Sequence, residues 1–249
     1  DGSCNGLQHF AGIMLDQKTA EAVNVVQTNT ERSADIYTQV ADGVEILLTK
    51  QAAEGIEEAH YWVGKVSRDV VKQPVMTLSY GVTRIGMRDQ IVDKCRKLVR
   101  KGKLEYQEGT NSSLAAFLAE QIHGVIGDVA GAAFDVMNWL ASAASTKAQV
   151  IDDLDGAFSW VTPTGLPVVQ EYYDYETQRF KVFVEGRSVK FTQRTGSAQI
   201  KKPKQRQGAA PNFVHSLDAS HLMLTVNECA RHDIRDFAMI HDSFGTHAA

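Results

Sequence analysis

The chain has 249 residues, of which 43% are hydrophobic and 22% are charged, and its formal net charge is −4. This composition is ordinary for a globular protein with a sizeable packed core. The cysteines Cys4, Cys95 and Cys229 lie far apart and lack CxxC spacing, which argues against a zinc site and against a disulfide framework. No apolar run approaches ~20 residues, so we expect no membrane span.

Both ends of the sequence look like cuts through a longer protein. The chain begins at Asp1 without an initiator methionine, and it stops shortly after an apolar, strand-like run at 237–240. We therefore expect further segments on either side, including a strand directly before Asp1.

Helical spacing of apolar residues dominates the first part of the chain. It predicts a helix beginning near residue 7 and, after a polar patch at 28–33, a long helix with apolar positions from 36 to 48. A further helical pattern covers 59–81 and contains Pro74. A proline in a helix interior removes a hydrogen bond and clashes with the carbonyl four residues back. We expect either a kink at Pro74 or a new helix that begins there.

Within this pattern, Arg68, Lys72, Met76 and Tyr80 are spaced four residues apart and are followed by Gly81, a helix stop signal. Side chains four apart lie on one slowly drifting helix face. Two cations on that face can bind an extended polyanion such as a triphosphate, and an aromatic ring beyond them can meet a base or a sugar. Alone, the stretch rather favours a solvated Arg/Lys face followed by a core tyrosine.

The middle of the chain continues with helical patterns. Residues 89–103 predict a basic amphipathic helix with a solvated face. Residues 113–150 predict a long buried helix or a helical pair, in which His123 is a core histidine rather than a ligand. The helical pattern then ends, and the sequence predicts two β-hairpins at 158–172 and 180–192.

The last part of the chain returns to helix and ends on a strand. We expect a basic loop at 201–206, a helix over 209–232, and a short buried strand at 237–240 that places His241 and Asp242 at its tip. This order predicts an α+β fold, in which the chain ends complete a sheet and a long, mostly helical insertion lies between them.

Two carboxylates, Asp1 and Asp242, follow suspected strand ends. Two such side chains, brought together, can hold two divalent ions roughly 3.5–4 Å apart for phosphoryl transfer. Mg²⁺ suits this arrangement, because one or two carboxylates, phosphate oxygens and water satisfy it. Taken singly, each aspartate is more often a turn former or a helix cap.

Four motifs occur in a specific order along the chain: residues 1–10 (DGSCNGLQHF), the Arg68–Lys72–Tyr80 helix, residues 211–216 (PNFVHS) and residues 241–244 (HDSF). Together they resemble the single-subunit, bacteriophage-type DNA-directed RNA polymerases, which include mitochondrial and chloroplast enzymes. The resemblance runs over the whole chain.

The resemblance implies a right-hand polymerase fold with an incomplete palm sheet. Residues 1–29 and 215–249 would form two palm segments, and residues 30–214 would form mainly helical fingers. A promoter-reading hairpin would occupy about 172–206, where Arg179 and Lys181 would reach base edges in the major groove.

The resemblance also implies a metal site. Asp1 and Asp242, with the carbonyl of Gly2, would bind two Mg²⁺ ions, and His241 would support this site and the primer end. One ion would lower the pKa of the primer 3′-hydroxyl, and the other would hold the triphosphate and stabilise the departing pyrophosphate.

The implied nucleotide site uses Arg68 and Lys72 for the triphosphate, with Lys72 placed to protonate or neutralise the leaving group. Tyr80 would close the pocket, and His215 would help to hold the ribose. Related DNA polymerases carry a glutamate where this chain has Gly6, so we expect an open space there for a ribose 2′-hydroxyl.

The expected activity is template-dependent RNA synthesis by a monomer. Its partners would be the double-stranded DNA template and promoter, nascent RNA and ribonucleoside triphosphates. The expected location is the cytoplasm of an infected bacterial host, with a mitochondrion or plastid as the alternative. A related DNA polymerase and a non-catalytic nucleic-acid-binding piece remain open, and we expect the isolated 249-residue chain to be weakly active or inactive.

Overall fold

The structure is a computed structural model that describes residues 2–27, 33–102, 104–105, 111–150, 156–240 and 242–247. The helices are α1 (Asn5–Met14), α2 (Gln17–Ala22), α3 (Ile36–Ala53), α4 (Glu57–Trp62), α5 (Arg68–Leu78), α6 (Arg84–Arg100), α7 (Asn111–Val129), α8 (Gly131–Val150) and α9 (Lys202–Arg231). The strands are β1 (Ser159–Val161), β2 (Pro167–Val169), β3 (Tyr173–Val184), β4 (Arg187–Ile200), β5 (Phe237–Ile240) and β6 (Ser243–Thr246). Helices combined with small antiparallel sheets agree with the predicted α+β class.

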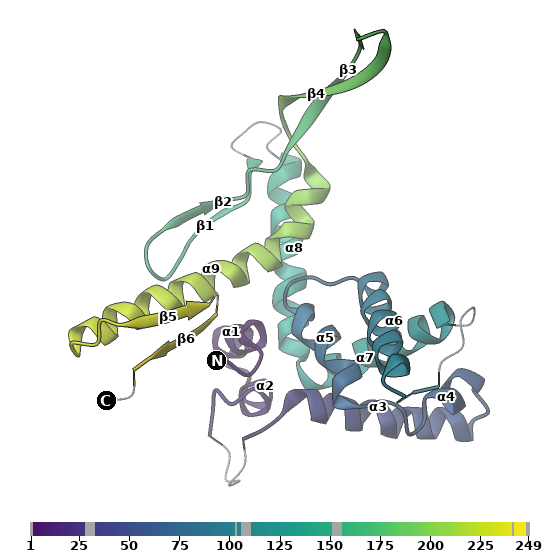
Figure 1. Cartoon of the computed structure of the whole chain (residues 1–249). Helices are drawn as coiled ribbons and strands as arrows, with labels where there is room; N and C mark the ends of the chain where they lie inside the picture. The colour runs from purple at the N-terminus through teal and green to yellow at the C-terminus, as the bar shows by residue number, and fades with distance from the viewer. Residues whose placement is uncertain are drawn as a thin grey trace.

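Helices α1 to α9 all contribute buried side chains to one shared hydrophobic core, and α3 to α7 gather in one body beside α1 (Figure 1). The largest fully buried side chains include Leu7, Phe10, Leu48, Trp62, Leu78, Ile91, Leu118, Ile122 and Ile126. The indole N–H of Trp62 donates to the carbonyl of Leu114 at 2.9 Å, so the α7 backbone satisfies the polar atom of this buried ring. The core therefore fixes α5, which carries the predicted cations, against its neighbours.

The helical pattern at 59–81 forms two helices instead of one. Helix α4 ends before Gly64, whose φ of 74° lies in the left-handed region that favours glycine after a helix. Helix α5 then begins at Arg68 and runs without a break through Pro74 to Leu78. The alternative of a new helix beginning at Pro74 is therefore wrong.

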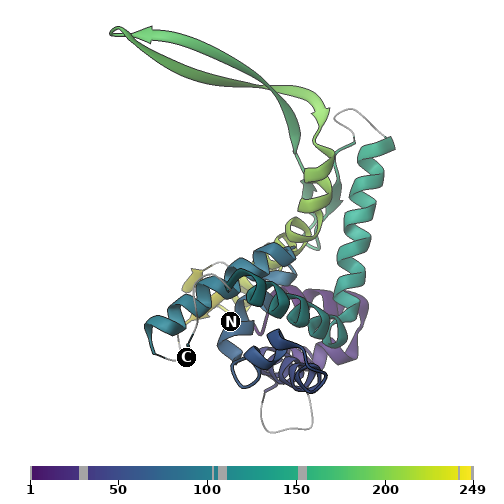
Figure 2. The ribbon, with the colours of Figure 1, turned by 90° about the vertical axis from the view of Figure 1, so that its right-hand side faces the viewer.

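The predicted helical pair at 113–150 is confirmed as α7 and α8, which are separated at Ala130. Helix α8 then lies alongside the first part of α9 (Figures 1 and 2). His123 is half-buried in α7 with its ring against the edge of Phe134, at a centroid distance of 4.9 Å, as a core histidine would be.

Both predicted hairpins are confirmed, and the second is longer than expected. Strands β1 and β2 pair antiparallel, and Trp160 attaches them to α9 by donating to the Ser216 hydroxyl at 2.9 Å. Strands β3 and β4 pair along most of their length, with Phe180 opposite Phe191. In both views this second hairpin extends far from the helical body (Figures 1 and 2).

The basic loop expected at 201–206 is wrong, because these residues mostly form the first turns of α9. Pro203 lies in the first turn of α9. A backbone N–H there has no partner within the helix, so a proline in this turn costs no helical hydrogen bond. Helix α9 also continues through Pro211, whose ring approaches Gly81 just after α5. The predicted palm boundary at 214/215 falls inside this helix, and the domain division stays a prediction.

Strand β5 exists as predicted, but it is not buried. It pairs with β6, with Met239 opposite Phe244, and the side chains of Met239 and Ile240 are 38% and 70% exposed. Within the described residues this sheet has two strands, so its faces lack the cover that an apolar run predicts. No helix in the described part of the chain is long and apolar enough to cross a membrane.

Candidate functional site

A cavity of about 510 Å³ lies where α1, α3, α5 and the end of β5 converge. Its lining includes the predicted site residues Gly2, Gly6, Arg68, Lys72, Tyr80 and Asp242. The fold therefore brings residues from both chain ends and from the cationic helix to one place. Asp1 and His241 lie outside the described residues.

Helix α5 presents its cations to this cavity because its other face is apolar. Val70, Val71, Val75 and Leu78 are buried in the core. Arg68, Lys72 and Met76 lie on the opposite face and line the cavity. The predicted helix face is thus confirmed over the length of α5, while Tyr80 follows in the turn after the helix.

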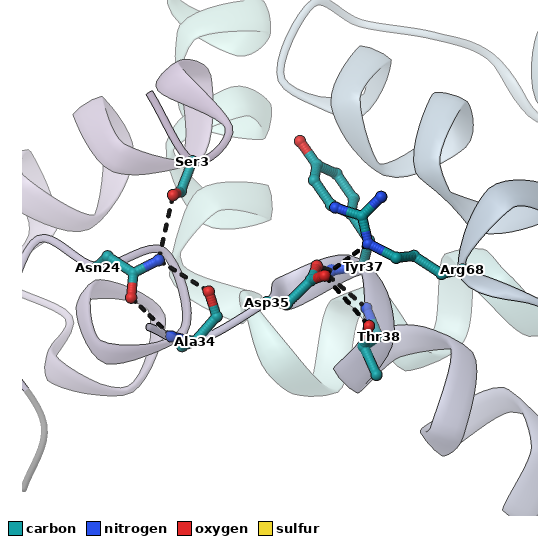
Figure 3. A network of polar contacts seen from close by, with 7 residues as sticks. All are labelled: Ser3, Asn24, Ala34, Asp35, Tyr37, Thr38 and Arg68. Carbon is teal, nitrogen blue, oxygen red and sulfur yellow. Dashed lines mark hydrogen bonds and ion pairs between the residues drawn. The ribbon is translucent and has the colours of Figure 1, made fainter. Parts of the chain in front are cut away.

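The Tyr37 ring lies beside both cations. The Arg68 guanidinium carbon is 5.1 Å from the ring centroid, and the Lys72 ammonium is 5.8 Å from it. Arg68 also donates from Nε to Asp35, the residue that caps α3 (Figure 3). Burial alone would raise the pKa of Asp35, but hydrogen bonds from Arg68 and from the Thr38 backbone bring the pKa below its usual value.

Tyr80 is held by residues of α1 and α9. Its ring stacks on His215, with centroids 4.7 Å apart and an interplanar angle of 19°. Its hydroxyl donates to Asp218 at 3.4 Å, and the other oxygen of Asp218 bonds His9 at 2.9 Å. Burial, followed by the charges of Asp218 and Asp242, raises the pKa of Tyr80, so the phenol stays protonated and can donate.

The segment from Gly2 to Gly6 forms the opposite wall of the cavity. Cys4 takes a left-handed conformation at φ 75°, which is costly for a residue with a side chain and turns the chain into α1. Burial raises the pKa of its thiol to about 11, so this cysteine is not a nucleophile near neutral pH. Asn5 donates to the Asp242 carbonyl at 3.5 Å and so joins this wall to the end of β5.

Gly6 lies in close contact with the turn after α5. A Cβ at Gly6 would lie 2.0 Å from the Ser79 hydroxyl and 3.3 Å from Val214. On the side where a Cβ would lie, protein fills the space, so the glycine permits close packing of α1 against the turn after α5, while Gly6 still borders the cavity. Its role toward a ribose stays a prediction.

The described residues supply part of a possible magnesium site. They contain no group of three or more His, Cys, Asp or Glu side chains that could hold a metal ion. The Asp242 carboxylate and the Gly2 carbonyl belong to residues that line the same cavity. Mg²⁺ is commonly held by one or two carboxylates with substrate phosphates and water, so this partial set fits such an ion.

Arg179 and Lys181 are not part of this cavity. They lie on β3, in the hairpin that extends away from the helical body (Figure 2). Lys181 pairs directly opposite Lys190, and like charges in this position destabilise a strand pair. The hairpin thus concentrates positive charge, although the chain as a whole is acidic.

Sequence reasoning missed Asp35 and Tyr37, which line the cavity, and Ser79 and Asp218, which contact Gly6 and Tyr80. Asp35 directly before the apolar Ile36 matches a helix N-cap signal, which could have marked the start of α3. No local pattern could have revealed that Asp35 meets Arg68, or that Asp218 meets Tyr80.

A family model described as DNA-dependent RNA polymerase matches residues 1–249. The chain belongs to the phage-type, single-subunit DNA-dependent RNA polymerase family. This membership confirms the resemblance inferred from the four motifs.

Similar members of the polymerase family come from organelles. The chain is 36% identical over 252 residues to the mitochondrial DNA-directed RNA polymerase of Mus musculus and covers 20% of that protein. It is 39% identical over 254 residues to the chloroplastic DNA-directed RNA polymerase 3B of Nicotiana tabacum, covering 24% of it. It is 33% identical over 258 residues to the mitochondrial enzyme of Schizosaccharomyces pombe, covering 21%. All of this chain is matched in each case, so it spans about a fifth to a quarter of these relatives.

Proposed function

We propose that the protein containing this chain is a template-dependent, DNA-directed RNA polymerase, and that the cavity between α1, α3 and α5 binds the incoming ribonucleotide. The observation that carries this proposal is the shared cavity lined by Gly2, Arg68, Lys72, Tyr80 and Asp242. The names of the relatives support the same activity.

In this proposal each side of the cavity has its own task. Arg68 and Lys72 bind the triphosphate, and Lys72 neutralises the leaving pyrophosphate. Tyr80 and His215, which stack on one another, hold the sugar and the base pair. A site that hydrogen-bonds a hydroxyl rejects an analogue lacking it, because its own polar groups are left unpaired.

Asp242 and the Gly2 carbonyl would hold Mg²⁺ together with Asp1. When bound, such ions neutralise phosphate charge and make the attacking hydroxyl more acidic. The chain itself supplies the carboxylates, and Asn5 holds the Gly2 wall beside Asp242 through its hydrogen bond.

The β3–β4 hairpin is proposed to contact promoter DNA. Between residues 177 and 194 it carries Arg179, Lys181, Arg187, Lys190 and Arg194 against the single acid Glu185, while Asp174 and Glu176 lie nearer the helical body. Arg179 and Lys181 are two residues apart on one strand, so they lie on the same face. The mutual repulsion of Lys181 and Lys190 would be relieved by phosphates.

The remaining assignments belong to the same proposal. Residues 1–29 and 215–249 would be palm and residues 30–214 fingers, in a monomeric enzyme. The organellar names of the relatives favour a mitochondrion or plastid over the cytoplasm of an infected bacterium.

The test is primer extension by the full-length protein on a DNA template with Mg²⁺ and ribonucleotides. Asp242→Asn and Lys72→Gln should each lower the rate by about 10²–10³, as expected for the loss of one electrostatic contact to the reacting groups. Lys97→Gln, which changes an exposed lysine on α6, should leave the rate unchanged. Clear preference for deoxynucleotides would instead indicate a DNA polymerase, and absence of extension by the wild type would contradict the proposal.

A further inference from the structure

The guanidinium of Arg68 is held at one edge. Its Nε donates to Asp35 Oδ2 at 2.5 Å, and its carbon lies 5.1 Å from the Tyr37 ring centroid. Among the described residues, its two terminal amino groups have no hydrogen-bond partner. Because Arg68 lines the cavity, this unpaired edge is available to an anion there.

Asp35 is itself fixed and does not behave as a mobile surface carboxylate. Its Oδ1 accepts from the backbone N–H groups of Tyr37 at 3.0 Å and Thr38 at 3.4 Å. Its Oδ2 accepts from the Thr38 hydroxyl at 3.2 Å, in addition to Arg68. These bonds cap α3, so the position of the carboxylate is set by the helix.

The segment before Asp35 is also held. Asn24 donates to the Ala34 carbonyl at 2.8 Å, accepts from the Ala34 N–H at 2.8 Å, and donates to the Ser3 hydroxyl at 3.1 Å (Figure 3). Ser3 and Ala34 both line the cavity. Asp35 is thus tied on one side to the Gly2–Gly6 wall and on the other to α3.

We propose that Asp35 is a positioning residue for the nucleotide site, which holds Arg68 by Nε so that its terminal amino groups meet the triphosphate. This inference rests on the proposed function. An arginine side chain has many rotamers, and fixing it before the ligand arrives removes part of the entropy cost of binding. Planar guanidinium groups bind phosphate through two parallel N–H donors, and the contact at Nε leaves such a pair free.

The opposite possibility is that Asp35 competes with the triphosphate for Arg68. The two roles predict opposite signs: losing a positioning residue weakens binding of a triphosphate, whereas losing a competitor strengthens it. The single contact at Nε favours positioning, because a phosphate need not displace it.

Asp35→Asn separates the contact with Arg68 from the helix cap. Asparagine is as good an N-cap as aspartate. Its carbonyl oxygen must stay at the Oδ1 position to accept from Tyr37 and Thr38, which turns the amide NH₂ toward the Arg68 cation. The variant should therefore fold normally and lose only its hold on Arg68. Asp16→Asn, directly before α2 and outside the cavity lining, is the control.

The first measurement is equilibrium binding of inorganic tripolyphosphate to the full-length protein. Asp35→Asn should weaken it about tenfold, equivalent to about 1.4 kcal/mol, and Asp16→Asn should not change it. In an Arg68→Ala background, Asp35→Asn should have no further effect. Unchanged or tighter binding, or an equal loss without Arg68, would overturn the inference.

The second measurement is primer extension, which separates this inference from the proposed function. Asp35→Asn should raise KM for ribonucleotides about tenfold with little change in kcat, while inhibition by a nucleoside monophosphate stays unchanged. Should the wild type bind tripolyphosphate in an Asp35-dependent way yet extend no primer, the polymerase assignment fails and the positioning role stands. An equal loss for the monophosphate would instead mean that Asp35 acts on the whole site and not through Arg68.

Discussion

Tyr80 and His215 stack face to face, with ring centroids 4.7 Å apart, although one follows α5 and the other lies in α9. The stack joins the cationic helix to the helix that leads into β5. Asp218, one turn after His215, accepts a hydrogen bond from the Tyr80 hydroxyl and also forms one with His9. Tyr80 is thereby held in a fixed orientation at the edge of the cavity.

We predict that His215→Ala raises KM for ribonucleotides about two- to tenfold, because an aromatic pair contributes roughly 0.5–1.5 kcal/mol beyond its buried area. Steady-state primer extension by the full-length protein measures this change. His215→Phe keeps a flat ring and should retain most of the affinity. If alanine and phenylalanine have equal effects, the stack is not what holds Tyr80.

Gly6→Ala should destabilise the fold by about 1–3 kcal/mol, as overpacking of a tight contact does. The added Cβ would lie 2.0 Å from the Ser79 hydroxyl oxygen and 2.4 Å from its Cβ. Because both atoms clash, Ser79→Gly should restore stability to Gly6→Ala, whereas Ser79→Ala should not. Thermal unfolding of the single and double variants checks this, and rescue by Ser79→Ala would contradict the packing.

Gln205→Leu should lower stability by about 1–3 kcal/mol, the cost of leaving buried polar groups unpaired. The fully buried Gln205 side chain donates to the Gln170 carbonyl at 2.7 Å and accepts from the Phe158 N–H at 3.1 Å. Leucine has a similar size but satisfies neither group. Gln207→Leu changes an exposed residue of the same helix and should be nearly neutral in denaturant unfolding.

His123 should make the fold sensitive to acid. Burial, followed by the charge of Arg84, lowers its pKa below the usual 6.5, although Glu120 acts in the opposite direction. The folded state therefore favours the neutral ring, and this stability is present above about pH 6.5 and is lost as pH falls through the lowered pKa.

We expect His123→Gln to lose less stability than the wild type between about pH 7 and pH 5. Melting temperatures across this range provide the measurement. His60→Gln removes an exposed histidine from α4 and should follow the wild type. Parallel curves for His123→Gln and the wild type would show that His123 does not contribute.

The sequence predicted what depends on local spacing. Apolar residues at helical intervals located α3, and the steps of four from Arg68 to Met76 predicted the face that α5 shows to the cavity. At 201–206 the positive charge and Pro203 wrongly indicated a loop. A proline is well tolerated in a first helical turn, and these residues mostly begin α9. Apolar spacing predicted one helical pattern over 59–81, whereas Gly64, with its positive φ, lies between α4 and α5.

The candidate site was predictable only through the resemblance of four ordered motifs. The contacts that hold it are long-range: Asp35 meets Arg68 33 positions away, and Tyr80 meets Asp218 138 positions away. Packing of the core determines which residues meet across these distances, and a short stretch of sequence does not show that packing. The close contact of Gly6 with Ser79 is of the same long-range kind, and the space expected beside Gly6 for a ribose 2′-hydroxyl stays a prediction.

The approach of Gly81 to Pro211 has a consequence for how such a site can vary. Gly81 has a φ of 75°, and the nearest atoms to a Cβ placed on it would be in the Pro211 ring, at 3.6 Å, and the Gln207 carbonyl, at 3.9 Å. Tyr80 directly precedes Gly81, and His215 lies one turn after Pro211. The geometry of the aromatic stack therefore depends on two positions, Gly81 and Pro211, that are not part of the stack. Under the proposed function, in which the stack holds the sugar, substitutions at Gly81 or Pro211 would change sugar selection although Tyr80 and His215 themselves stay the same.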